Sequence, residues 1–459
     1  MPSLPPGGRY GHAFHERSCI FQYIILETAD DMGECRGSVQ NPDPRGDPVR
    51  GMSLWTGIPG TVRESAISFR CRSNRGGVMK EVLEWLEARQ GEMLSLIELL
   101  VNIDSGSYCK EGIDRCGAIV ARELEALGFE TSVVPEADRG NHLRAQRPGK
   151  GEGELFLSAH LDTVFPAGTA GARPFRVEGG LAYGPGVGDI KGGIVQMLFA
   201  LKALRELGRS TPPTTVFLTG DEEIGSIRGR PHIEDIARRS SWVLVMEPAS
   251  EPGSVAVRRW GLGAFRLTIR GRAAHVLKPD SDGVNACREL ALKILALESL
   301  SDFARGVKVS VNLVSGGRSR QVTAAEAVAD IDVRVRDSSR MEEIEAMVRK
   351  VASTPILPGI VLQVEGKLTR PPLEPNPNTL KLLRLAAETA ERIGMVLKPI
   401  EEYGGSDGCF TAALGVATLD GLGPRTFDMC GDGERIEIVG IVPRTALLAG
   451  IVARLCEDP

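Results

Sequence analysis

The chain has 459 residues, which is long for one ordinary core and predicts two domains or more. Its net charge is −5, from 55 basic and 60 acidic residues, so the composition gives no reason to expect a nucleic-acid partner. No stretch approaches the ~20 apolar residues of a membrane span, and no membrane association is expected.

The nine cysteines are scattered along the chain and include no C-x-x-C pair. This distribution indicates free thiols in a reducing compartment rather than a disulfide framework, so we expect a cytoplasmic protein. There are only six histidines, and none follows His275. The C-terminal part of the chain therefore has no histidine to offer as a metal ligand.

Residues 1–78 differ in composition and periodicity from the rest of the chain. They are rich in Pro, Gly, Arg and Ser and lack sustained periodicity, so we expect a disordered extension. From Met79 to Leu100 apolar residues recur at helical spacing. A second helix is expected at about residues 114–127, with Gly128 as its C-terminal stop.

Short apolar strands then alternate with helices. Strands are expected at residues 130–134, 154–160, 215–218 and 242–247, and a helix at about residues 193–207. This alternation favours a mostly parallel sheet that is covered by helices on both faces.

The pattern changes again after residue 253. Strands are expected at residues 262–269, 307–314, 327–335 and 360–364, with helices at 283–297 and 341–351. Strands combined with two helices indicate a small α+β sandwich inserted into the larger domain. The expected organisation is an N-terminal extension (1–78), a larger domain in two parts (79–253 and 367–459) and the inserted domain (254–366).

Glu222 and Glu223 follow an apolar strand and lie between Gly220 and Gly225. Strand ends are where open α/β sheets place their ligands. Adjacent side chains on extended backbone point in opposite directions, so we expect one carboxylate at a metal and the other toward a substrate. An acidic turn on the surface is the alternative, and candidate ligands elsewhere in the chain weigh against it.

Candidate metal ligands recur at strand ends and loops, namely His160, Asp189, Glu223 and Glu247. Nitrogen and carboxylate ligands suit zinc. Asp162, two residues after His160, can orient the imidazole. Asp189 can bridge two metals ~3.5–4 Å apart, which leaves Glu222 free as general base on an activated water.

Five stretches occur in a characteristic order: Ser-Ala-His160-Leu-Asp162-Thr-Val-Phe-Pro, Tyr183-Gly-Pro-Gly-Val-Gly-Asp189-Ile-Lys-Gly-Gly, Gly220-Asp-Glu222-Glu223-Ile-Gly-Ser, Met246-Glu247-Pro and Gly271-Arg-Ala-Ala-His275. Each is weak alone, but together they are highly specific. From about Met79 to its end, the chain resembles the zinc metallopeptidases of the carboxypeptidase G and aminoacylase type, in particular the glutamate carboxypeptidases.

The resemblance implies two zinc ions per chain. One would be held by His160 and Glu247 and the other by Glu223, with Asp189 bridging them. Glu222 would act as base and later as proton donor. The Asp189–Ile190 peptide would be cis, an uncommon arrangement without proline.

The resemblance also implies substrate contacts and a partner. His275 would reach the substrate or a developing oxyanion, and Arg370 would bind the substrate's carboxylate. Gly405 and Ser406 belong to a glycine-rich loop that would line the same pocket. Gln321 stands where relatives have an asparagine and offers the same amide one methylene further out. A homodimer formed through the inserted domain is expected.

Relatives have a second metal-binding histidine near the C-terminus, and an alignment without gaps places Cys430 there. Three alternatives remain open. The Cys430 thiolate can bind zinc at ~2.3 Å with its thiol pKa depressed by the metal. Alternatively, the second metal is weak or lost, or the chain is a metal-poor relative with another role.

The sequence therefore predicts a two-domain α/β zinc hydrolase. It would cleave an amide bond next to a free carboxylate, as in a C-terminal glutamate or an N-acyl amino acid, by metal-activated water with Glu222 as general base. Its substrate would be a small molecule or short peptide. The alternative is an impaired or non-catalytic dimeric relative. A hydrolase with Cys430 as nucleophile would have only a distant histidine such as His275 as base.

Overall fold

The computed structural model describes residues 76–278 and 282–457. The predicted N-terminal extension falls almost wholly outside these residues, and α1 (Gly76–Glu87) begins slightly before the expected start at Met79. It is followed by α2 (Gln90–Val101) and α3 (Lys110–Ala126). Gly128 ends the α3 region with a φ of 82°, a conformation that glycine adopts without steric cost.

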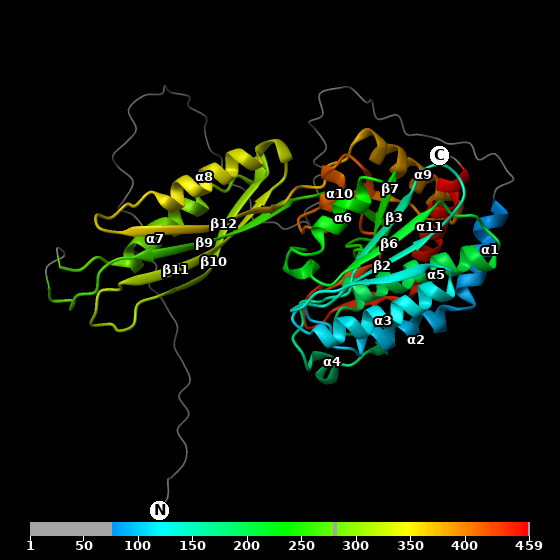
Figure 1. The fold of residues 1–459 in the computed structure, drawn as a ribbon, viewed down its shortest axis with the longest axis horizontal. Helices are drawn as coiled ribbons and strands as arrows, with labels where there is room; N and C mark the ends of the chain where they lie inside the picture. Colours follow the sequence, from blue (N-terminus) through cyan, green and yellow to red (C-terminus); the bar gives the residue numbers. More distant parts are fainter. Residues whose placement is uncertain (1–75, 279–281, 458–459) are drawn as a thin grey trace, which may run out of the picture. The chain divides into compact units, whose positions relative to one another are not determined.

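A six-stranded sheet forms the centre of the larger domain (Figure 1). Strands β6, β3, β7 and β14 run parallel, whereas β2 is antiparallel to both of its neighbours. The predicted mostly parallel sheet is confirmed, although β2 and β14 were not predicted. In spatial order the strands are β1 (Glu130–Val134), β2 (His142–Arg147), β6 (Thr214–Thr219), β3 (Leu155–His160), β7 (Trp242–Val245) and β14 (Ala417–Leu419).

Alternate residues of the central strands enter two different cores. Leu157 and Val216 belong to the large core on one face of the sheet, whereas Phe156 and Phe217 belong to a smaller core on the other. This period of two is what strands buried on both faces require. The helices contributing to these cores include α5 (Gly193–Glu206), α6 (Arg230–Ala237), α9 (Pro377–Arg392), α10 (Gly408–Ala413) and α11 (Ile438–Glu457).

One helix in the described part of the chain, α11, is long and apolar enough to cross a membrane, with a mean hydropathy of 1.7, so the prediction that no stretch approaches the length of such a span was wrong. However, 72% of that apolar window is buried inside the protein. The helix packs against α1, α5 and α9. Its apolar surface is therefore covered by the domain's own core, as expected of an interior helix.

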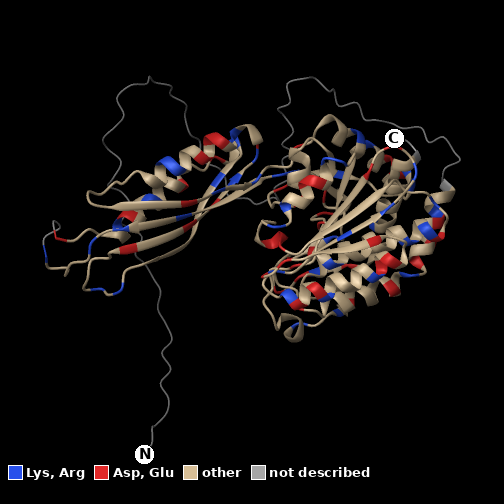
Figure 2. Ribbon diagram, viewed as in Figure 1, with Lys and Arg blue, Asp and Glu red and all other residues tan. Residues whose placement is uncertain are grey.

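Opposite charges are interspersed along exposed helices (Figure 2). On α6, Arg230 and Arg238 both pair with Glu234, and Arg239 pairs with Asp235, at N–O distances of 2.6, 3.0 and 2.7 Å. Pairs of this i, i+4 type on a helix contribute about 0.3–0.5 kcal/mol each. They stabilise the helix slightly, whereas the central sheet is stabilised by the apolar cores on its two faces.

The inserted domain is an antiparallel four-stranded sheet in the order β10-β11-β9-β12, with two helices and a core of its own. The predicted α+β sandwich is confirmed, while its boundaries at residues 253 and 366 stay predictions. Its elements are β9 (Gly261–Arg270), α7 (Ala286–Glu298), β10 (Val307–Gly316), β11 (Glu326–Val335), α8 (Met341–Ser353) and β12 (Val361–Arg370).

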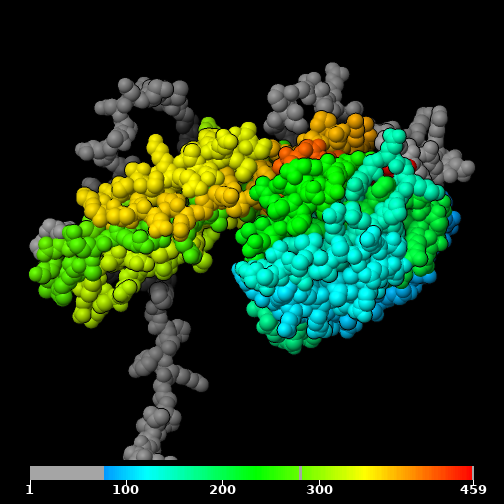
Figure 3. Space-filling model, in the orientation of Figure 1, coloured from blue at the N-terminus to red at the C-terminus, as the bar shows by residue number. Residues whose placement is uncertain are grey.

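The C-terminal segment completes the larger domain. Strand β14 pairs with β7, and β13 (Lys398–Glu402) pairs with β8 (Ser254–Arg259), so orange residues lie against green ones in Figure 3. A small sheet joins β16 (Arg435–Glu437) to β5 (Leu181–Tyr183), with β15 (Thr426–Phe427) and β4 (Arg176–Glu178) at its edges. This pairing brings the loop of Cys430 close to the loop of Asp189.

Candidate active site

The end of β3 delivers His160 and Asp162 into the protein interior, where both are buried. The Nδ1 atom of His160 lies 3.0 Å from the backbone oxygen of Asp162 and 3.5 Å from its carboxylate. The predicted orientation of the imidazole by Asp162 is thus made mainly through the backbone carbonyl. When Nδ1 donates its N–H to the Asp162 carbonyl, the lone pair of Nε2 is available to bind a metal.

The Asp162 carboxylate has another role, which sequence analysis missed. It accepts hydrogen bonds from the Ser107 hydroxyl at 2.7 Å and from the backbone N–H groups of Glu222 and Glu223 at 3.0 and 3.2 Å. These bonds anchor a 3₁₀ turn over Glu222–Ile224, so the prediction of extended backbone there was wrong. Successive side chains of such a turn diverge by about 120°, and the two carboxylates still face different partners.

All five predicted metal ligands come together in two groups that share Asp189. His160, Asp189 and Glu247 place ligand atoms within 4.8 Å of one another, and so do Asp189, Glu223 and Cys430. His160 Nε2 lies 3.1 Å from Asp189 Oδ1 and 3.5 Å from Glu247 Oε1. On the other side, Cys430 Sγ lies 3.4 Å from Asp189 Oδ2.

This donor set fits divalent metal ions. Glu223 Oε1 is buried and has no hydrogen-bond partner among the described residues. Burial and repulsion from Asp189 raise the pKa of Glu223 to about 10, and they also raise the pKa values of Glu247 and of the Cys430 thiol. A bound cation would remove this penalty because it favours the deprotonated form of each group. Nitrogen, oxygen and sulfur donors are together acceptable to zinc.

The loop that carries Asp189 is held by Glu434, a residue that sequence analysis missed. The buried Glu434 carboxylate accepts the backbone N–H groups of Gly188 at 2.8 Å, Asp189 at 3.1 Å and Gly186 at 3.3 Å. The Asp189–Ile190 peptide that follows is cis, as the resemblance implied. Nothing in the sequence separates Glu434 from the other acidic residues of the same loop.

Replacing Glu434 by Gln is expected to weaken metal binding by about 10–100-fold, the effect typical of residues that position metal ligands. The amide keeps one acceptor oxygen but turns an N–H donor toward backbone N–H groups. Calorimetric titration of metal-free protein with zinc measures the change. Asp432→Asn is the matched control, because the Asp432 side chain is 99% exposed on the same loop. Equal losses in both variants would contradict the positioning role.

Glu222 lies in direct contact with Arg370. Its Oε1 is 2.9 Å from Arg370 Nη1, and Arg370 itself is only 2% exposed. The same Nη1 lies 3.1 Å from Asp407 Oδ1, while Nη2 donates to Ser226 Oγ at 3.2 Å. Burial raises the pKa of Glu222 to about 8, although Arg370 opposes the rise. The predicted base and the residue predicted to bind the substrate's carboxylate are thus paired with each other.

The glycine-rich loop supports this pair. A Cβ atom at Gly405 would lie 2.7 Å from Arg370 Cδ, so glycine permits the close approach of the arginine. Ser406 is buried, and its hydroxyl donates to Asp420 Oδ2. The predicted pocket role for Ser406 finds no support in this arrangement, because its hydroxyl is engaged in the interior.

His275 and Gln321 lie together in exposed loops of the inserted domain. His275 forms a β-bridge with Val322, and the backbone N–H of Val276 donates to the Gln321 carbonyl at 3.1 Å. Over residues 76–278 and 282–457, no hydrogen bond or ion pair joins either side chain to the metal-ligand groups. Their predicted substrate contacts remain predictions.

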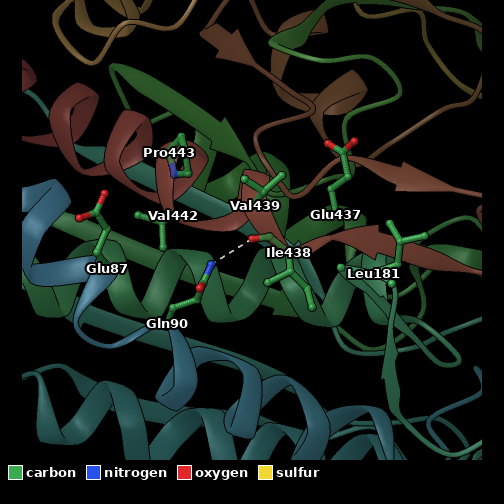
Figure 4. Close-up of a pocket in the computed structure, with 10 residues that line it drawn as sticks. Glu87, Gln90, Leu181, Glu437, Ile438, Val439, Val442 and Pro443 are labelled. Atoms are coloured by element: carbon green, nitrogen blue, oxygen red, sulfur yellow. Dashed lines mark hydrogen bonds between the residues drawn. The ribbon is translucent and has the colours of Figure 1, made fainter.

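A pocket of about 710 Å³ lies elsewhere, at the start of α11 (Figure 4). There the Gln90 side chain donates to the Ile438 carbonyl at 3.1 Å. None of the predicted site residues lines this pocket, so the candidate active site is defined by its converging side chains. Its lining includes Glu87, Leu181, Glu437, Val439, Val442 and Pro443.

Comparison with known proteins agrees with this geometry. The profile of peptidase family M20/M25/M40 matches residues 156–454. The chain is 30% identical over 377 residues to carboxypeptidase G2 of Pseudomonas sp. (strain RS-16), covering 80% of this chain and 89% of that protein. The chain therefore belongs to peptidase family M20/M25/M40, a family of metal-dependent hydrolases, and is a hydrolytic enzyme of the metallopeptidase class.

Solved structures show the same fold. Aminopeptidase PepT from Bacillus cereus ATCC 10987 matches with a TM-score of 0.68 and 19% identity, over 80% of this chain and 98% of that one. The Bacillus subtilis YXEP protein, a dinuclear metal-binding peptidase of the M20 family, matches with a TM-score of 0.59 and 15% identity, over 81% and 100% of the two chains. At these identities the similarity supports the fold alone.

Proposed function

We propose that the protein is a zinc-dependent hydrolase that cleaves an amide or peptide bond next to a free carboxylate. The observation that carries the proposal is the convergence of two ligand groups on Asp189, with Glu222 near enough to His160 and Glu247 for their charges to shift its pKa. The similarity to a carboxypeptidase, and the resemblance to glutamate carboxypeptidases, favour a C-terminal glutamate or an N-acyl amino acid as substrate.

His160, Asp189 and Glu247 would hold one zinc ion, and Asp189, Glu223 and Cys430 the other. Bound zinc would supply a Lewis acid and a lowered pKa for water. Glu222 would accept the proton of the attacking water on its carboxylate and deliver it to the leaving nitrogen.

The protein's own hydrogen bonds would hold the base and the metal ligands in separate orientations. Asp162 fixes the turn of Glu222 and Glu223 through their backbone N–H groups, so the base and the ligand keep separate directions. Glu434 holds the backbone of Asp189, and the carbonyl of Asp162 holds the His160 ring. Each group is thereby oriented before a substrate arrives.

The substrate-binding pocket would be lined by His275, Gln321 and Gly405. The inserted domain would form a homodimer interface. All six cysteines of the described residues are free, as expected of a cytoplasmic protein. The substrate would be a small molecule or short peptide that carries a free carboxylate.

Metal content and hydrolysis of N-acyl glutamates by the purified protein test the proposal. We expect about two zinc ions per chain and activity that a chelator removes and added zinc restores. The α-amide of the same substrate should be hydrolysed with a kcat/KM lower by about 10²-fold or more, since it cannot form the charge-assisted hydrogen bonds. No zinc and no activity after metal addition would instead favour a non-catalytic dimeric relative.

A further inference from the structure

Arg370 is the centre of a buried polar cluster with an uneven charge. Its single guanidinium contacts two carboxylates, with Nη1 2.9 Å from Glu222 Oε1 and 3.1 Å from Asp407 Oδ1. The side chains of Arg370 and Asp407 are 3% and 4% exposed. One guanidinium therefore pairs with two carboxyl groups in a buried region, where an unpaired charge is costly.

Asp407 is the fixed partner of the two. It accepts hydrogen bonds from the Thr219 hydroxyl at 2.9 Å, from the Ser226 hydroxyl and from Arg370. These donors come from the end of β6, from the turn after Glu223 and from the end of β12, so three segments of the chain hold this carboxylate. Asp407 alone can neutralise Arg370.

Arg370 is also fixed. Its guanidinium carbon lies 4.9 Å from the centroid of the Phe410 ring, and its Nη2 donates to Ser226 Oγ and to the Glu222 backbone oxygen. Gly405 leaves no side chain between the loop backbone and the arginine stem. A guanidinium held on several sides presents its two-armed edge in one direction.

Glu222 is the partner that can leave. Its backbone is anchored by Asp162, but the one side-chain contact that the structure gives its carboxylate, among the described residues, is Arg370. Loss of this contact would leave the neutral pair of Arg370 and Asp407 intact. The Oε1 atom that Arg370 holds would then be free to approach another partner.

We propose that Arg370 exchanges carboxylates when substrate binds: the substrate's free carboxylate replaces that of Glu222, Asp407 stays, and the released Glu222 becomes available for proton transfer. This inference rests on the proposed function. Exchange of one carboxylate for another conserves the charge around the guanidinium, so the second partner of Arg370 is replaced and not lost. A neutral carboxamide cannot replace it and leaves Glu222 engaged. The free carboxylate is then required for release of the base as well as for binding.

Ligand binding to the zinc-loaded protein tests the exchange without any hydrolysis. The probes are glutamate and its α-amide, isoglutamine, titrated calorimetrically into the wild-type protein and the isosteric Glu222→Gln variant. Because the glutamine amide competes poorly for a guanidinium, glutamate should bind the variant about tenfold more tightly than the wild type. Isoglutamine should bind both proteins with affinities that agree within about twofold.

Arg370→Lys supplies a second, independent measurement. Lysine keeps the charge but lacks the two-armed edge, so the preference for glutamate over isoglutamine should fall, and Glu222→Gln should add little in this background. The matched control is Arg230→Lys, because Arg230 is exposed and also lies over the Phe410 ring, at 4.7 Å. It should leave both affinities unchanged.

The outcomes separate the inference from the proposed function. Equal affinities of glutamate for wild type and Glu222→Gln, or no binding to either, would overturn the exchange and leave Arg370 as a permanent partner of the base. Tighter binding to the variant would support the exchange even if the wild-type protein hydrolysed no N-acyl glutamate. The absence of hydrolysis in that case would count only against the proposed substrate.

Discussion

Replacing Glu222 by Gln is expected to lower kcat for amide hydrolysis by about 10²–10⁴-fold, the contribution of a well-placed general base. Glutamine has nearly the shape of glutamate but cannot take up the proton. Zinc content should not change, because Glu222 belongs to neither ligand group. The measurement is kcat on an N-acyl glutamate together with metal content by mass spectrometry.

The pH profile gives the same variant a sharper test. A base works in its deprotonated form, so kcat should rise with pH through the pKa of Glu222. Burial raises that pKa to about 8 from the ordinary 4.5, and bound cations lower it again, so the acid limb should lie between these values. Glu222→Gln should abolish this limb. Glu251→Gln, at an exposed acid, is the control. Retained kcat or lost zinc in Glu222→Gln would contradict the assigned role.

Much of the fold could be predicted from the sequence because apolar periodicity marks its elements. The buried run of β6 and the helical spacing of α5 depend on local pattern and on burial from both sides. Strand β2, His142–Arg147, was missed because polar residues interrupt it. Its place is fixed by pairing with β1 and β6, and such pairing leaves no local signal.

The grouping of the candidate metal ligands could also be predicted, since His160 ends a strand and Glu223 follows one in a recognisable context. The contacts that organise them could not. Arg370 reaches Glu222 across 148 positions of the chain, and Glu434 reaches Asp189 across 245. These contacts depend on how β12, the glycine-rich loop and the C-terminal loop pack. Ser406 illustrates the same limit, because packing turns its hydroxyl toward Asp420.

Cys430 should be a metal ligand, and its replacement by Ser is expected to reduce zinc content from about two ions per chain to about one. Serine keeps the size of the side chain but is a much poorer ligand than a thiolate. The Sγ atom lies in the group with Asp189 and Glu223, where one carboxylate oxygen is buried and unpartnered. Cobalt substitution gives a direct readout, because thiolate ligation produces a charge-transfer absorption band that carboxylate and imidazole ligands do not.

The cobalt band should be present in the wild type and absent in Cys430→Ser and Cys430→His. It should be retained in Cys456→Ser, because the thiol of Cys456 donates to the Lys150 carbonyl and belongs to neither ligand group. A band that persists in Cys430→Ser would assign the ligand to another thiol, and no band in the wild type would remove Cys430 from the metal site.

Cys430→His should behave differently from Cys430→Ser. Imidazole is a neutral ligand, whereas a thiolate adds a negative charge that weakens the Lewis acidity of its metal. The histidine variant should therefore keep about two zinc ions and hydrolyse N-acyl glutamates about tenfold faster than the wild type. Unchanged kcat with two zinc ions would mean that the charge of this ligand does not limit the reaction. A loss of the second zinc in Cys430→His would show that the backbone at Cys430, with its φ of 61°, presents a short thiol but not an imidazole to the metal.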